Sequence, residues 1–299
     1  TDMDILSMFM DVGLKKAMST DAFMGDPNTF MEVYGLVTLY ALSFKKYKGK
    51  CAVCPANSRN PDVIMSELSE KVFLWWQNVF KGIVRDHSPS NQEDCAVLIL
   101  AKISEWLGMC AKSDFDTCVK DGFIKAMKIT FREWEDISTV LAFYCDTTSK
   151  KNGSNIPSTI GGLAGFYEAL GFIYQHLPNK DVFLEYYRRL MANRLLQKEE
   201  SKDVEQGMLG VIKQRSLLET VACSRLEGMN QDIIMSETLS EQFTQWQNAK
   251  PSGSGPAIKV GKVFMLTQNR WPAQKTASVY AGQTADAVMK QFETFFATR

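Results

Sequence analysis

Apolar residues recur at steps of three and four along most of the chain, which is the period of an α-helix. Stretches rich in Gly, Pro and small polar residues separate these periodic runs, for example Ser149–Pro157 and Lys250–Pro256. The fold class that this pattern predicts is mainly α. The helices that we expect are Asp4–Met18, Thr29–Lys46, Pro61–Val84, Glu93–Ala111, Phe115–Arg132, Glu135–Thr148, Gly162–Leu177, Lys180–Gln197, Ser201–Thr220 and Glu237–Trp246.

The pattern changes after the linker that ends at Pro256. Ile258–Leu266 alternates apolar and polar positions and is rich in β-branched residues, so it predicts a β-strand, with a possible second strand over Thr276–Tyr280. Thr284–Phe296 returns to helical spacing. A lone strand cannot pair its backbone donors and acceptors, so we expect it to find a partner strand in this chain or in another protein.

Composition and charge narrow the possible partners. The chain has 299 residues, with 34 basic and 34 acidic side chains, and this balance argues against a strongly basic nucleic-acid binder or a protein of anionic membrane surfaces. No apolar run reaches the roughly 20 residues that a bilayer requires, and the first residues do not resemble a signal peptide. We therefore expect neither nucleic acid nor membrane as a partner.

Candidate catalytic and metal-binding residues are few. Cys51 and Cys54 have the spacing of a zinc half-site but lack a second close pair, so ordinary free thiols are the favoured interpretation. His87 and His176 stand apart from any nucleophile pattern. The run Gly161–Gly165 lacks the Lys-Ser/Thr ending of a phosphate loop, and we interpret it as a helix start or a close helix contact. We expect no catalytic site, no metal and no cofactor.

One long region resembles a known family. The segment Asn179–Leu196, with Lys180-Asp-Val-Phe183 at its start, resembles the opening of the cullin homology domain. Further motifs follow in the same order, and weaker similarity to cullin repeats precedes them over Phe115–Cys145 and Met31–Tyr34. The later motifs are Met208, Lys213-Gln214, Arg225-Leu226, Met229, Gln231-Asp232-Ile233, Glu241-Gln242-Phe243, Val263–Leu266, Trp271-Pro272 and Phe292–Arg299.

The resemblance implies an architecture. A cullin-repeat-like helical stalk is expected over residues 1–148, the four-helix-bundle part of the cullin homology domain over 158–249, and the start of an α/β module over 257–299. The family's winged helix and the lysine that accepts a ubiquitin-like modifier would follow Arg299. On this comparison the sequence represents a shortened cullin that lacks the winged-helix and modification region.

The resemblance also implies a function. Cullins are non-catalytic scaffold subunits of RING-type E3 ubiquitin ligases in the cytoplasm and nucleus. They bridge a Skp-type or BTB-type adaptor, which carries a substrate receptor, and a RING-box protein, which recruits the ubiquitin-conjugating enzyme. Such a scaffold accelerates transfer by holding the reactants close together. The alternative is a truncated cullin-like protein that sequesters adaptors or RING partners without supporting ligation. An enzyme on a helical bundle would need a metal or a nucleophile site.

The resemblance assigns two docking surfaces. In the family, a strand of the RING-box protein pairs into the sheet of the cullin's α/β module by β-augmentation. The residues expected to bind the RING partner are Val260, Val263, Phe264, Leu266 and Trp271. Near the other end of the chain, a stripe of apolar side chains is expected either to bind the adaptor or to pack into the core. Its members are Met31, Tyr34, Val37 and Tyr40.

A basic surface is the third expectation. Four cations of the predicted helix Lys180–Gln197 and the residue after it lie toward one side: Arg188, Arg189, Arg194 and Lys198. They are either simply solvated or, as the resemblance implies, attract an acidic segment of a partner in a salt-dependent manner.

Overall fold

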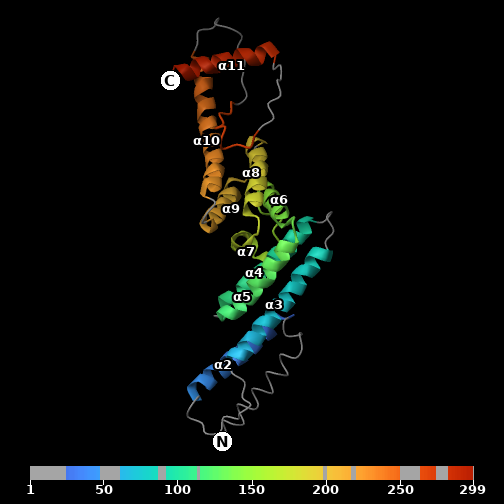
Figure 1. Cartoon of the computed structure of the whole chain (residues 1–299). Coiled ribbons are helices and arrows are strands. Elements are labelled where there is room, and N and C mark those ends of the chain that lie inside the picture. Colours follow the sequence, from blue (N-terminus) through green and yellow to red (C-terminus); the bar gives the residue numbers. More distant parts are fainter. Residues whose placement is uncertain are drawn as a thin grey trace. The chain divides into compact units, whose positions relative to one another are not determined.

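The structure is a computed structural model, and it describes residues 25–47, 61–86, 92–112, 115–197, 201–216, 220–249, 263–273 and 282–298. All regular secondary structure within these ranges is helical (Figure 1). The helices are α2 (Pro27–Tyr47), α3 (Pro61–Asp86), α4 (Gln92–Lys112), α5 (Thr117–Glu133), α6 (Ile137–Lys150), the 3-10 helix η3 (Ser158–Ile160), α7 (Gly162–His176), α8 (Lys180–Gln197), α9 (Lys202–Arg215), α10 (Thr220–Asn248) and α11 (Gly282–Ala297).

The chain divides into two compact units. The first comprises Thr1–Tyr144 and Asn155–Lys180, and the second comprises Cys145–Ser154 and Asp181–Arg299. No described helix is both long and apolar enough to cross a bilayer. The division into three domains that the sequence suggested stays a prediction.

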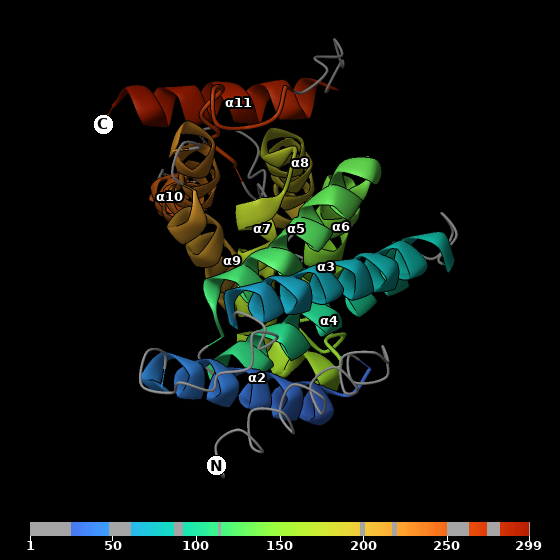
Figure 2. The ribbon, with the colours of Figure 1, turned by 60° about the horizontal axis from the view of Figure 1, so that its bottom comes forward.

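Aromatic side chains form the core of the first unit. α3 packs along α5, and α4 packs against α7 (Figure 2). Trp106 of α4 stacks on Phe123 of α5 with ring centroids 4.4 Å apart, and Trp76 of α3 meets the same ring edge-on at 4.9 Å. Burial of such large side chains supplies most of the hydrophobic stabilisation of a helical unit.

The glycine-rich run Gly161–Gly165 begins α7, as the sequence predicted. Gly161 has φ +85°, a left-handed conformation that glycine adopts without a steric cost. A Cβ atom on Gly165 would collide with the backbone carbonyl of Ile160, so this glycine allows the close approach of η3 and α7. The run is therefore a helix start and a close contact.

The second unit contains α8, α9, α10 and α11. The inner face of α8 is buried through Phe183, Tyr187 and Leu195. At the other end of the unit, α11 lies across the end of α10 (Figures 1 and 2). These two helices share an apolar cluster, the α10–α11 cluster, made of Leu239, Phe243, Phe292 and Phe295.

Most helices follow their predicted ranges, and α8 begins and ends at the predicted residues. Two boundaries differ by more than two residues, because α9 already ends at Arg215, before the predicted Thr220, and α10 begins at Thr220, well before the predicted Glu237. The helix predicted over Thr284–Phe296 is present as α11. The mainly α fold class is confirmed.

The predicted α/β module is not supported by the described residues. Val263–Leu266 belongs to no β-sheet in the described part of the chain. Its backbone instead pairs with side chains of α10, as detailed below. Residues 258–262, the second predicted strand Thr276–Tyr280 and the predicted helix Asp4–Met18 lie outside the described residues.

Candidate functional site

The candidate site is an irregular segment, residues 263–273, that lies against α10; we call it the strap. The backbone amide of Val263 donates to the hydroxyl of Ser240 (3.1 Å), which donates back to the carbonyl of Val263 (3.0 Å). Ser236 accepts the amide of Met265 at 2.8 Å, and its hydroxyl donates to the carbonyl of Asp232 in its own helix at 2.6 Å and lies 3.2 Å from the carbonyl of Met265. Asp232 accepts the amide of Thr267 at 2.8 Å. The strap therefore runs antiparallel to α10.

Asp232 is the main attachment point of the strap. Its carboxylate also accepts hydrogen bonds from the Trp271 indole (2.9 Å), the Thr267 hydroxyl (3.0 Å) and the Arg270 guanidinium (2.8 Å). Burial raises the pKa of Asp232, but the bonds from Thr267 and Trp271 and the charge of Arg270 outweigh burial and hold this pKa below its ordinary value. Arg270 lies where a side chain on Gly228 would be, so the glycine leaves room for it.

Apolar contacts add to these polar ones. Val263 and Met265 pack against the α10–α11 cluster. Successive side chains of an extended segment point to opposite sides, which places Phe264 and Leu266 on the other side of the strap, where both are half-buried. The backbone of the strap is thus bound by side chains of α10, and alternate side chains of the strap pack against the α10–α11 cluster.

The residues expected to bind a RING partner have different surroundings. Val263, Phe264 and Leu266 are half-buried in the strap, and Val260 lies outside the described residues. The expectation that Trp271 contacts a RING partner is corrected, because this side chain is 5% exposed and its indole donates a hydrogen bond to Asp232. Its position fits the attachment of the strap to α10 rather than an exposed contact surface.

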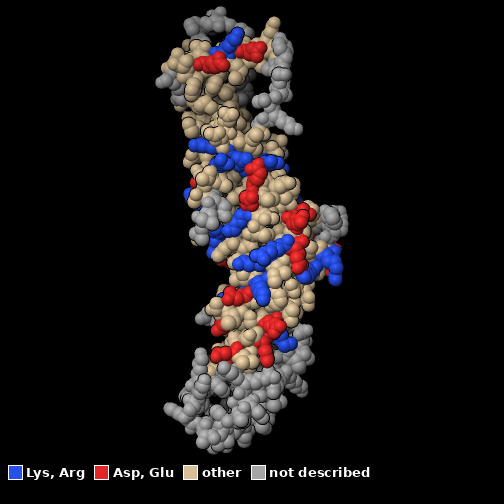
Figure 3. Space-filling model, in the orientation of Figure 1, with Lys and Arg blue, Asp and Glu red and all other residues tan. Residues whose placement is uncertain are grey.

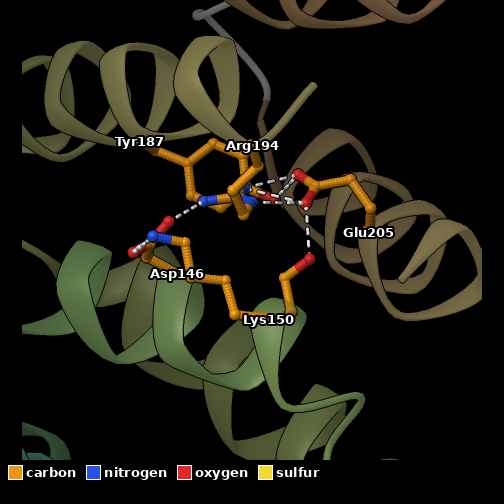
Figure 4. Close-up of polar contacts among 6 residues, drawn as sticks. Asp146, Lys150, Tyr187, Arg194 and Glu205 are labelled. Carbon is orange, nitrogen blue, oxygen red and sulfur yellow. Dashed lines mark hydrogen bonds and ion pairs between the residues drawn. The ribbon is translucent and has the colours of Figure 1, made fainter. Parts of the chain in front are cut away.

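A second polar site lies among α6, α8 and α9 (Figure 4); we call it the charge cluster. The fully buried guanidinium of Arg194 contacts Asp146 at 2.6 Å and is bidentate to Glu205, through Nη2 to Oε1 at 2.9 Å and Nε to Oε2 at 3.1 Å. Glu205, in the first turn of α9, also accepts hydrogen bonds from Tyr187 (2.6 Å) and Ser149 (3.0 Å).

The electrostatics of the charge cluster explain why a buried cation is tolerated. Burial lowers the pKa of Arg194, but Glu205, Tyr187 and Asp146 raise it, so the guanidinium stays charged. Burial and the neighbouring Glu205 raise the pKa of Tyr187, which therefore remains a neutral donor. Lys150 adds a half-exposed ion pair to Asp146 at 3.3 Å. The cluster joins three helices.

The charge cluster shows that Arg194 does not belong to the predicted basic face. Arg194 is buried and paired, because α9 brings Glu205 and α6 brings Asp146 beside it. Arg188 and Arg189 both pair with Glu185, and only the latter is well exposed, with 61% of its side chain accessible. Lys198 lies outside the described residues. Figure 3 shows basic and acidic side chains side by side on the face that it presents.

The predicted adaptor stripe lies on α2. Tyr34 and Val37 are buried, and the Tyr34 hydroxyl accepts the amide of Asp116 at 2.6 Å, so these two side chains belong to the core of the first unit rather than to an exposed surface. Met31 is half-buried, and the side chain of Tyr40 lies outside what the structure describes. Among the side chains of α2 that the structure describes, the large apolar ones that are exposed are Leu36, Leu39 and Leu42.

Thiol chemistry is unfavourable at three cysteines, of which Cys95 and Cys145 are buried and Cys110 is half-buried. Burial raises the pKa of Cys95 and of Cys110 to about 11, and it also raises the pKa of Cys145. Such thiols stay protonated near neutral pH and are poor nucleophiles. No group of His, Cys, Asp and Glu suited to a metal ion occurs among the described residues, and Cys51 and Cys54 lie outside them.

The sequence carried a signal for the strap that hydrophobic periodicity does not detect. Asp232, Ser236 and Ser240 stand four residues apart, which places three polar groups on one stripe of a helix. Glu205 is harder to find from the sequence, since its partner Arg194 lies on a different helix. Neither Ser236, Ser240 nor Glu205 was among the predicted site residues.

Comparison with known proteins agrees with this architecture. The family model of the cullin alpha solenoid domain matches residues 71–240. Cullin-1 of Oryza sativa is 26% identical over 185 residues, which cover 59% of this chain and 24% of that protein. Cullin-1 of Schizosaccharomyces pombe is 30% identical over 137 residues, 42% of this chain and 17% of that protein. Cullin-4A of Mus musculus is 27% identical over 180 residues, 58% of this chain and 23% of that protein.

These relatives are much longer than the aligned region, which spans about a quarter of their length or less. The family model nevertheless covers more than half of the present chain, from the middle of α3 to Ser240 of α10. It includes the charge cluster and the three residues of α10 that hold the strap. The chain belongs to the cullin family.

Proposed function

We propose that this chain is a scaffold of a cullin-RING ubiquitin ligase, acting in the cytoplasm or the nucleus. The observation that carries the proposal is the cullin family match over residues 71–240. The two polar sites support it, because both of them join elements of the chain to one another. A protein of this kind contributes to ubiquitin transfer by positioning its partners, and the RING-bound conjugating enzyme supplies the reactive thioester.

The RING-box protein is proposed to pair with the strap. α10 engages the backbone of Val263, Met265 and Thr267, which are alternate residues of the segment. In an extended chain the backbone groups of the intervening residues point to the opposite side. Within the described part of the chain, no hydrogen bond engages the backbone of Phe264 or Leu266. These two residues therefore present an edge that a partner strand can pair with.

One substitution tests this edge. Leu266→Pro removes the outward amide while the amides bonded to α10 stay in place, and Leu266→Ala is the matched control that removes the side chain but keeps the amide. We expect Leu266→Pro to weaken co-purification of a RING-box protein at least tenfold relative to Leu266→Ala. Equal binding by the two variants would exclude pairing at this edge.

The adaptor, which in the family is of the Skp or BTB type, is proposed to dock on α2. Leu36, Leu39 and Leu42 give α2 an outward apolar stripe, with exposed fractions of 45%, 57% and 60%. We expect Leu39→Asp/Leu42→Asp to abolish adaptor binding, because a charge in an apolar contact is left without a partner. Leu74→Asp on α3, at a residue that is 49% exposed, is the control that leaves adaptor binding intact.

Reconstitution tests the function as a whole. The purified chain is combined with a RING-box protein, an adaptor carrying a substrate receptor, and a charged conjugating enzyme, and substrate ubiquitination is followed. Transfer that depends on the chain supports the scaffold. Binding of both partners without transfer would instead support the alternative, a protein that sequesters them. Failure to bind either partner would refute both.

A further inference from the structure

We infer that Asp232, Ser236 and Ser240 form a template on α10 that holds the strap extended before any partner arrives, and that these three residues thereby set the affinity for a partner strand. This inference rests on the proposed pairing with a RING-box strand. It assigns positioning residues to that interaction, on the side of the strap that the partner does not touch.

The geometry of the two elements explains why a helix can serve as a template for an extended chain. Residues four apart on a helix are separated by about 6 Å along its axis. Two residues of an extended segment span about 6.6 Å. Asp232, Ser236 and Ser240 therefore match Thr267, Met265 and Val263 in turn, and the hydrogen bonds follow this register without a gap.

The two serines imitate a neighbouring strand. Both hydroxyls accept the amide of a strap residue, and that of Ser240 also donates to the carbonyl of the same residue, Val263, which is the double contact that a paired strand would make. The hydroxyl of Ser236 lies 2.6 Å from the carbonyl of Asp232 in its own helix, to which it donates, and 3.2 Å from the carbonyl of Met265. A serine can do this because its hydroxyl is at once a donor and an acceptor, whereas an alanine offers neither. Asp232 ends the series with a bond to the amide of Thr267 and fixes the strap's following turn through Arg270 and Trp271.

The template affects the affinity for a partner strand by ordering the strap before the partner binds. A free extended segment loses conformational entropy when a partner strand fixes it, and this loss subtracts from the binding free energy. A strap that α10 already holds extended has lost this freedom in advance. The partner then meets an edge that is close to its bound conformation, so removing the template weakens binding although no residue that the partner touches has changed.

The test is the double variant Ser236→Ala/Ser240→Ala in the full chain. Both changes improve the helix propensity of α10, so the helix itself is retained. The matched control is Thr238→Ala/Thr244→Ala, because those two exposed hydroxyls bond only to carbonyls of their own helix, Ile234 and Ser240. Two quantities are measured: amide hydrogen exchange at Val263 and Met265 in the free chain, and the affinity for a purified RING-box protein.

We expect the serine variant to exchange both amides at least tenfold faster and to bind the RING-box protein about tenfold more weakly, while the control changes neither quantity. Unchanged exchange in the serine variant would refute the template. Faster exchange with unchanged affinity would refute its role in positioning and leave the proposed function standing. If the wild-type chain bound no RING-box protein, the proposed pairing would fail, and the positioning role would fall with it.

Discussion

The charge cluster and the Asp232 site attach parts of the second unit in opposite ways. Arg194 is a buried cation whose partners are two carboxylates on other helices, so it joins three regular elements in a closed interior. Asp232 is a buried anion whose partners are neutral groups and one half-exposed arginine of an irregular segment. We therefore expect the first site to hold the framework of the unit, and the second to hold a segment that can be released without unfolding the helices.

Removal of Arg194 is expected to have the largest effect on the charge cluster. Arg194→Met would leave Glu205 and Asp146 as buried carboxylates without their main partner, which costs about 3–5 kcal/mol of the free energy of unfolding. Urea unfolding followed by circular dichroism measures it. Arg189→Met, at an exposed position, is the control and should stay within about 0.5 kcal/mol of wild type. A small loss for both variants would show that the cluster does not hold the framework.

A smaller effect is expected at the strap. Asp232→Ala would leave the Trp271 indole and the Thr267 amide without an acceptor, at a cost of about 2–3 kcal/mol. The strap should detach while the helices persist, so we expect increased quenching of tryptophan fluorescence by acrylamide with little change in helical circular dichroism. A parallel loss of helix content would contradict the distinction between framework and releasable segment.

The contribution of Asp232 to stability should depend on pH, which gives a further test of the attachment of the strap. The folded-state pKa of Asp232 is lowered, so its stabilising contribution is fully present above the unfolded value of about 3.9 and is lost as pH falls through the folded pKa. We expect the difference in unfolding free energy between wild type and Asp232→Asn to be greatest near neutral pH and to shrink below about pH 4. A difference that stays constant down to pH 2 would show that ionisation of Asp232 contributes nothing to the attachment.

The smallest effects come from two helical glycines. Gly210 of α9 has open space where a Cβ would be, so Gly210→Ala should stabilise the chain by about 0.5–1 kcal/mol through helix propensity alone. Gly228→Ala should bring no such gain, because the new Cβ would displace the Arg270 side chain from Asp232. Thermal unfolding of the two variants side by side measures the difference, and an equal gain in both would exclude a role for Arg270.

Hydrophobic periodicity predicted the helices whose inner faces are apolar, and α8 is the clearest case. It failed over residues 220–236 of α10, where the inward positions include Asp232 and Ser236 and therefore interrupt the apolar stripe. The predicted strand failed for a related reason. The alternation in Ile258–Leu266 agrees with the fact that alternate residues, Val263 and Met265, contact α10, but the hydrogen-bonding partner is a row of helix side chains, which no pattern within the segment itself specifies.

The polar sites were less accessible to sequence reasoning than the fold. Arg194 resembles a surface cation in its own helix, and only the positions of Glu205 and Asp146 in space explain its burial. The spacing of Tyr34 and Val37 is likewise compatible with a docking stripe and with a core stripe. Tyr34 belongs to the core because Phe115 packs against its ring and the amide of Asp116 donates to its hydroxyl. Local spacing identifies which side chains share a face, and tertiary packing decides what that face meets.

The serine contacts also have a consequence for how this region can diverge among related proteins. Ser236 and Ser240 recognise main-chain atoms that every amino acid except proline presents in the same form. Substitutions at Phe264 and Leu266 would consequently leave the seating on α10 intact. The outward side chains can thus be substituted to suit a new binding partner, while the backbone conformation that presents them stays the same.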